Sequence, residues 1–196
     1  MRDSRYAVRP LRVQDADELG RVHVQVWREA YAQHMPADFL AGLDPVKFAE
    51  RWRLRFEMDE PDGVVVVATG LEGEIDGFAS AGRTRDEDAP TGWELYAINV
   101  LAEHQGTGVA DQLISAAIAD RPVTLWVLRD NARAQAFYRR HGFRVEGATK
   151  VHEGTGAPEI RMIRNQLSDP AMQGAHRGRR LRRVAGDVGH PVRGSS

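Results

Sequence analysis

A glycine-rich turn, with the sequence QGTGVA at residues 105–110, is the stretch of this chain best suited to hold an anion. It follows residues 94–100, which alternate like a strand, and it precedes an apolar helical stripe over 109–118. The first-turn amides of a helix have no partners within it, and the helix dipole adds partial positive charge there. Glycines let an anion approach because no Cβ stands in the way. The pattern predicts a phosphate seat at the amino end of this helix.

The turn differs from two familiar phosphate loops. No Lys-Ser or Lys-Thr pair follows the glycines, as a Walker A loop requires, and Asp111 stands where the dinucleotide fingerprint has its third glycine. The turn does fit the pattern Gln/Arg-x-x-Gly-x-Gly/Ala, through Gln105, Gly108 and Ala110. Because so short a pattern also suits a plain strand–turn–helix, its interpretation depends on a second motif.

The second motif is the sequence NARAQAFYRRHGF at residues 131–143. Its aromatic residues follow helical spacing, and Gly142 is placed to end the helix. Every defining position of the pattern N-x-x-A-x-x-F-Y-x-x-x-G-F is filled. With both motifs in order, the chain resembles the GNAT superfamily of acyl-CoA N-acyltransferases over about residues 6–164. One departure is Ala102, where the family usually has proline.

The resemblance implies an α/β (α+β) fold, with a mixed, mostly antiparallel sheet flanked by helices. It also implies acetyl-CoA as co-substrate and direct transfer to an amine in a ternary complex. The chain has no cysteine, so a covalent acyl-cysteine is excluded. The cofactor contacts that the resemblance implies are Ile98, Asn99, Val100, Gln105, Gly106, Thr107, Gly108, Val109, Ala110, Asn131 and Phe137.

Glu94 is the predicted catalytic base. A lysine-like amine has a pKa of about 10.4, so it arrives mostly protonated and must lose a proton before it can attack. Strict alternation places Glu94 on one face with Tyr96, Ile98 and Val100, and an apolar setting destabilises a carboxylate and favours proton uptake. The alternative is a solvent-facing glutamate near a strand end, and the sequence leaves open whether Glu94 acts directly or through water.

Tyr138 is the predicted catalytic acid, because it resembles the family tyrosine that protonates the departing thiolate. The alternative is a buried aromatic residue packed beside Phe137. Asn131 has a second interpretation as well, since asparagine is a favourable helix N-cap.

The acceptor side is less visible in the sequence. The candidate substrate-binding residues, each equally consistent with a structural role, are Trp27, Tyr31, Tyr96 and Glu159. We expect a small-molecule amine as the acceptor. The alternatives are a protein amino terminus or lysine, and a non-catalytic acyl-CoA-binding protein whose basic tail binds nucleic acid.

The helices and strands that position these residues are predicted from the spacing of apolar residues and from the glycines and prolines that interrupt it. Asp15 and Glu18 form a D-x-x-E pattern that predicts a capping box and a helix beginning near Ala16. The chain then carries a helical insertion from Pro36. The expected strands lie at 6–12, 63–69, 75–85, 94–100, 123–128, 144–151 and 158–163.

Composition bounds the remaining possibilities. With 42% hydrophobic and 28% charged residues, the 196-residue chain is typical of one soluble domain. It has no apolar leader and no metal-ligand histidine spacing, so we expect a cytoplasmic protein with no metal and no membrane partner.

The domain is expected to span residues 1–164, followed by a basic, disordered tail at 165–196. The tail holds six arginines against two aspartates within a net charge of −1, so the domain itself is negative and favours a cationic acceptor. We expect no nucleic-acid partner, and the sequence leaves a homodimer open.

Overall fold

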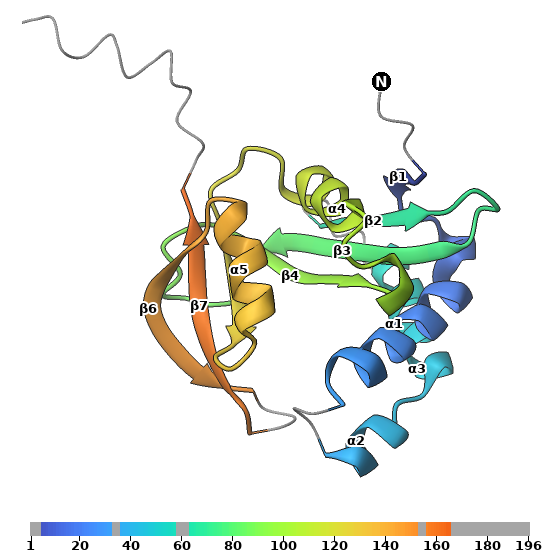
Figure 1. The fold of residues 1–196 in the computed structure, drawn as a ribbon, viewed down its shortest axis with the longest axis horizontal. Coiled ribbons are helices and arrows are strands. Elements are labelled where there is room, and N and C mark those ends of the chain that lie inside the picture. The colour runs from blue at the N-terminus through green and yellow to red at the C-terminus, as the bar shows by residue number, and fades with distance from the viewer. Residues whose placement is uncertain (1–4, 33–35, 58–62, 153–155, 166–196) are drawn as a thin grey trace, which may run out of the picture.

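The computed structural model describes residues 5–32, 36–57, 63–152 and 156–165 (Figure 1). The predicted tail at 165–196 lies outside these residues except for Asn165. The elements are β1 (Ala7–Pro10), α1 (Ala16–Ala30), α2 (Ala37–Ala41), α3 (Pro45–Glu57), β2 (Val64–Thr69), β3 (Ile75–Arg83), β4 (Trp93–Val100), α4 (Val109–Ile118), β5 (Val123–Leu128), α5 (Ala132–Arg140), β6 (Arg144–Val151) and β7 (Pro158–Arg164).

The strands form one seven-stranded sheet in the order β1-β2-β3-β4-β5-β7-β6. Neighbouring strands run antiparallel, except that β4 and β5 run parallel. A parallel pair needs a crossover connection, and α4 supplies it. The predicted mixed, mostly antiparallel sheet flanked by helices is therefore confirmed.

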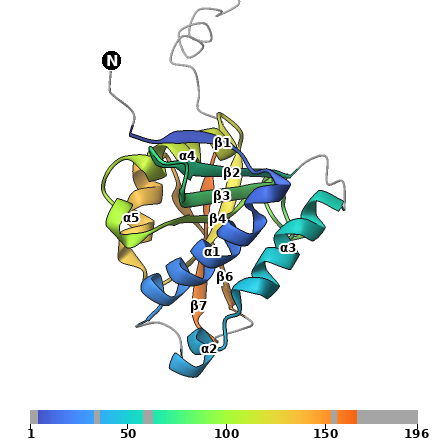
Figure 2. The ribbon, with the colours of Figure 1, turned by 90° about the vertical axis from the view of Figure 1, so that its right-hand side faces the viewer.

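Helices cover both faces of the sheet (Figure 2). On one face, α4 buries Leu113, Ile114 and Ile118 in the larger apolar core, which continues under α5. On the other face, α1 packs Leu19 against Phe78 of β3, and α3 closes over α1. Each buried apolar side chain of this kind stabilises the fold by about 1.5–3 kcal/mol, so both faces are firmly held.

The sheet opens between β4 and β5. These strands pair only at Glu94–Thr124 and Leu95–Leu125, at the start of each strand. Beyond Leu95, the edge of β4 that faces β5 has no strand partner among the described residues. The two strands therefore separate after Leu95, and a cleft lies between them.

A β-bulge interrupts β4 at Tyr96. In the pairing with β3, Ser80 lies opposite Ala97, whereas Ala81 lies opposite Leu95. Tyr96 is thus the extra residue of β4 in this register, and its hydroxyl donates to the carbonyl of Arg83 on β3.

The bulge shifts the alternation of β4 by one residue, so side chains before and after it point to different faces of the sheet than an uninterrupted strand would give. Leu95 packs in the core under α4 before the bulge, and Ile98 and Val100 pack in the same core after it. Since neighbouring residues of a strand face opposite sides, Glu94 points away from that core. The prediction that Glu94 shares one face with Ile98 and Val100 is wrong, because it assumed an uninterrupted strand.

The predicted capping box at α1 is also wrong, although the helix begins at Ala16 as expected. The Asp15 carboxylate accepts hydrogen bonds from the Arg12 amide at 2.8 Å and from the Arg9 guanidinium at 2.6 and 3.0 Å. Glu18 accepts from the amide of Ile75, at 2.8 Å. Both carboxylates tie the helix start to other segments, and the Arg9 bond lowers the pKa of Asp15.

Candidate active site

A cleft of about 830 Å³ occupies the opening between β4 and β5. One wall is the β4 segment at 96–99, and the other is the β5 segment at 126–128 together with α5. Side chains of α1 and α3 close a third side. A cleft of this volume falls in the range of small-molecule sites.

The glycine turn has the geometry of an anion seat. Gly106 and Gly108 adopt φ of +80° and +89°, a region that favours glycine, and α4 begins directly afterwards at Val109. No described side chain caps this helix start. The amides in the first turn of α4 have no carbonyl acceptor within the helix, so they can donate hydrogen bonds to a phosphate.

Two side chains of the turn stabilise its own backbone. The Gln105 Nε2 donates to the carbonyl of Val100 at 3.1 Å, and the Thr107 hydroxyl donates to the carbonyl of His104 at 2.6 Å. Both were predicted as cofactor contacts. In this structure their side chains fix the loop, and the loop's backbone faces the anion seat.

His104 ties the turn to the sheet, a contact that the sequence analysis did not identify. Its Nδ1 lies 2.9 Å from the Tyr6 hydroxyl, and its Nε2 lies 3.2 Å from the Asp76 carboxylate. Asp76 is almost fully buried, and this burial raises its pKa. Tyr6 directly precedes β1 and Asp76 lies on β3. Both are far from His104 in the sequence, so no local pattern could have identified them.

Tyr138 lies on α5 and lines the cleft. It is buried against Phe137 and Phe143, with ring centroids 5.5 and 5.7 Å away. Burial, and secondarily the neighbouring Tyr31, raises the pKa of Tyr138. The phenol is therefore neutral at physiological pH and holds a proton that it can donate.

Asn131 serves as the N-cap of α5, and its side chain also lines the cleft. Its Oδ1 accepts a hydrogen bond from the Ala134 amide at 3.0 Å. Phe137 is not among the residues that line the cleft, and its ring centroid lies 4.6 Å from that of His141, with the two rings tilted by 50°. Of the two, only Asn131 is placed to meet a ligand in the cleft directly.

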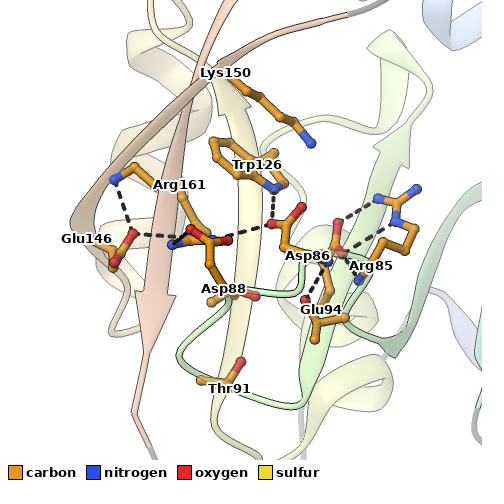
Figure 3. Close-up of polar contacts among 12 residues, drawn as sticks. Arg85, Asp86, Asp88, Thr91, Glu94, Trp126, Glu146, Lys150 and Arg161 are labelled. Atoms are coloured by element: carbon orange, nitrogen blue, oxygen red, sulfur yellow. Dashed lines mark hydrogen bonds and ion pairs between the residues drawn. The ribbon is translucent and has the colours of Figure 1, made fainter.

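Glu94 is held in an ion pair with Arg85 (Figure 3). Its carboxylate is 2% exposed and accepts from Arg85 Nη2 at 2.5 Å, from Nε at 3.3 Å and from the main-chain amide at 3.1 Å. Arg85 lines the cleft, whereas Glu94 does not. The guanidinium of Arg85 therefore stands where the sequence predicted apolar neighbours of Glu94.

The predicted acceptor-side residues Trp27, Tyr31, Tyr96 and Glu159 all line the cleft. Glu159 is buried and is the one carboxylate among the described lining residues. Burial, and then the Glu159 charge, raises the pKa of Tyr31. The cleft is also lined by the guanidiniums of Arg51, Arg55 and Arg85, so a cationic amine entering it would find a negative lining charge at Glu159.

A polar cluster centred on Arg161 was not predicted from the sequence (Figure 3). The Arg161 guanidinium lies 2.9 Å from Glu146, 2.8 Å from Asp88 and 3.5 Å from Asp86. It joins the β3–β4 connection to β6 and β7, and the indole of Trp126 also donates to Asp86. In the sequence, each of these residues reads as an ordinary strand or loop residue.

Within the described ranges, no helix is long and apolar enough to cross a membrane. Across the same residues, no group of three or more His, Asp or Glu side chains is arranged to hold a metal ion.

Comparison with known proteins places these observations in a family. Residues 61–145 match the family described as "Acetyltransferase (GNAT) domain". The N-acetyltransferase YuaI of Bacillus subtilis is 27% identical over 175 residues, covering 82% of this chain and 98% of that protein. An N-acetyltransferase of Mycobacterium tuberculosis is 30% identical over 151 residues, covering 71% of this chain and 90% of its own length.

A solved structure is similar in fold. It is the PaiA N-acetyltransferase of Thermoplasma acidophilum in complex with coenzyme A, with a TM-score of 0.63 and 17% identity over 82% of this chain and 98% of that one. Because the similarity covers 82% of this chain, it extends well beyond the glycine turn.

Proposed function

Because this chain belongs to the GNAT superfamily of N-acetyltransferases and takes acetyl-CoA as its co-substrate, we propose that it acetylates the primary amine of a small molecule by direct transfer in a ternary complex. The observation that carries the proposal is a single cleft lined both by Asn131 and Tyr138 of α5 and by the acceptor-side aromatic residues with Glu159. A cleft of about 830 Å³ suits a small acceptor better than a folded protein surface.

The residues divide the chemistry between them. The amides at the start of α4 bind the pyrophosphate of acetyl-CoA, and the unpaired edge of β4 holds the thioester beside the acceptor. The amine attacks the thioester carbonyl, the carbon–sulfur bond breaks, and Tyr138 gives its proton to the departing thiolate. Its raised pKa keeps that proton in place until the thiolate forms. The attacking nitrogen loses a proton as the amide forms, and this proton returns through water to the Tyr138 phenolate.

Glu159 and Glu94 have different parts in this proposal. Glu159 attracts the protonated amine into the cleft, and the proton leaves through water before attack. Glu94 acts indirectly: its carboxylate holds Arg85 in place, and the Arg85 guanidinium forms part of the cleft wall. We therefore propose Glu94 as a positioning residue in place of the direct base that the sequence suggested.

The test is thiol release from acetyl-CoA with n-butylamine, 1,4-diaminobutane, glucosamine and a peptide with a free amino terminus. A parallel thermal-shift assay measures acetyl-CoA binding. Stabilisation by acetyl-CoA with release on a small amine supports the proposal. Release on the peptide alone would replace it with protein acetylation, and binding without release on any amine would contradict the acceptor class.

A further inference from the structure

The strands β5, β7 and β6 carry a second group of charged and aromatic side chains on the sheet face opposite α5. Trp126 lies opposite Arg161 in the pairing of β5 with β7, and Lys150 lies opposite Glu159 in the pairing of β6 with β7. The intervening residues, such as Val127 and Met162, pack in the apolar core. Because strand residues alternate, the polar side chains lie on the face of the sheet away from that core.

An ammonium group already occupies this face (Figure 3). The Lys150 Nζ lies 4.2 Å from the centroid of the Trp126 ring and 3.9 Å from the Glu159 carboxylate. An indole face and a carboxylate are the two kinds of group that best favour a cation in a protein. The Lys150 side chain is 41% exposed, and its flexible stem lets the ammonium leave without disturbing β6.

The surroundings of Trp126 carry more negative than positive charge. Formal charges are −1 on each of Asp86, Asp88, Glu146 and Glu159 and +1 on each of Arg161 and Lys150. Arg161 lowers the pKa of Asp88 and Glu146 by hydrogen bonding, so both carboxylates are ionised at neutral pH. These six groups leave an excess of two negative charges next to the indole, which favours a further cation there. The guanidiniums of Arg51, Arg55 and Arg85 also line the cleft, so this excess is local to Trp126.

The Trp126 ring is fixed independently of Lys150. Its Nε1 donates to the Asp86 carboxylate at 2.7 Å, and Asp86 is itself held by Arg161. The Arg161 guanidinium also lies 5.4 Å from the ring centroid. The aromatic surface is therefore preorganised and would keep its orientation if another cation took the place of Lys150.

Trp126 and Glu159 line the same cleft as Tyr138, whereas Lys150 does not. We propose that the face of Trp126 and the carboxylate of Glu159 form an ammonium subsite, and that the acceptor carries a second cationic nitrogen which displaces Lys150 from it. This inference rests on the proposed function and narrows its acceptor to a diamine or polyamine. One nitrogen is held at Trp126 while the other is acetylated near Tyr138.

The test compares 1,4-diaminobutane with n-butylamine, which have the same carbon chain and differ by one ammonium group. For the wild-type protein, kcat/KM is expected to favour the diamine by about tenfold, the range of a partly desolvated cation–π contact. Lys150→Met removes the resident cation but keeps the stem, and it is expected to widen the preference about threefold, through a lower KM for the diamine.

Trp126→Leu removes the aromatic face and should bring the preference to within about twofold of unity. Arg144→Met is the matched control, because Arg144 is an exposed cation on the same strand and lies away from the cleft. The control should leave the wild-type preference unchanged. A narrower preference in Lys150→Met, or equal kcat/KM values for the two amines in the wild type, would overturn the subsite.

A binding measurement separates this proposal from the function itself. With CoA present, 1,4-diaminobutane should raise the melting temperature of the wild-type protein more than n-butylamine does, and Trp126→Leu should abolish the difference. If that pattern holds while neither amine releases thiol, the subsite stands and the proposed acetyl acceptor is wrong. If acetylation proceeds with no difference between the amines, the function stands and the subsite is rejected.

Discussion

The imidazole of His141 lies 2.8 Å from the carboxylate of Asp111, across the gap between the end of α5 and the first turn of α4. Asp111 stands beside the anion seat, with one oxygen 4.0 Å from where a Cβ on Gly108 would lie. An unpaired carboxylate there would repel a phosphate. His141 offsets that repulsion by its hydrogen-bond contact with the Asp111 carboxylate.

His141→Ala should therefore weaken acetyl-CoA binding about threefold to tenfold, the cost of a like charge close to the pyrophosphate. Titration calorimetry at low ionic strength measures the Kd. Asp111→Asn should bind as well as the wild type or better, and the double variant should regain wild-type affinity. If the double variant binds as weakly as His141→Ala, the histidine acts through packing on Phe137 and not through charge.

Tyr138→Phe should lower kcat by about 10²-fold, because it removes the proton donor but keeps the buried ring. The Kd for acetyl-CoA should stay near the wild-type value. The pKa of Tyr138 is raised, so loss of its proton should not reduce wild-type turnover below about pH 10. Tyr31→Phe is the control: it lines the same cleft, and the change should appear in the KM of the amine. Equal effects of both variants on kcat would remove the acid role.

The helices, strands and both motifs were predictable because their signals are local. The stripe on α4, the glycines before it and the N-cap at Asn131 each depend on residues within a few positions of one another. The helix beginning at Ala16 was found for the same reason. Its capping was not, since Glu18 is bound by the amide of Ile75, on a strand that is distant in the sequence.

Within the candidate site, only the residues that belong to the two family motifs were predictable from the sequence. The bulge at Tyr96 depends on how β4 aligns with β3, so alternation along β4 alone gave the wrong facing for Glu94. Trp126 looked like an interior strand residue. Its polar surroundings exist only because β5, β7 and the β3–β4 connection meet around Arg161.

Glu94→Gln distinguishes a positioning residue from a direct base. If Glu94 only fixes Arg85, kcat/KM should fall less than about tenfold, because the amide retains part of the hydrogen bonding. Arg85→Met should then give a similar loss, and the double variant should be no worse than either single one. A direct base would instead cost about 10²–10⁴ in rate and change the acid limb of the pH profile, while Arg85→Met would have the smaller effect.

Arg161→Met should produce the largest loss of stability among these variants. Arg161 is 3% exposed, and its removal leaves Asp86, Asp88 and Glu146 facing one another without a cation. Asp86 and Glu146 are 22% and 26% exposed and would lose their cationic partner, so the free energy of unfolding at neutral pH should fall; Asp88 is 78% exposed and should contribute little. Arg144→Met, an exposed arginine on β6, should change the free energy of unfolding by less than about 0.5 kcal/mol.

The pH dependence of that loss has a definite sign. Hydrogen bonding to Arg161 lowers the pKa of Asp88 and Glu146 in the folded protein. Their stabilisation is present above the unfolded pKa values, about 4, and is lost as the pH falls through the lowered folded values. In Arg161→Met the carboxylates repel one another at neutral pH, and protonation relieves the repulsion. The difference in the free energy of unfolding between the variant and the wild type, measured by urea denaturation, should therefore narrow steadily below about pH 4. A difference that stays constant from pH 7 to pH 3 would mean that Arg161 stabilises the sheet by packing on Trp126 and not by charge.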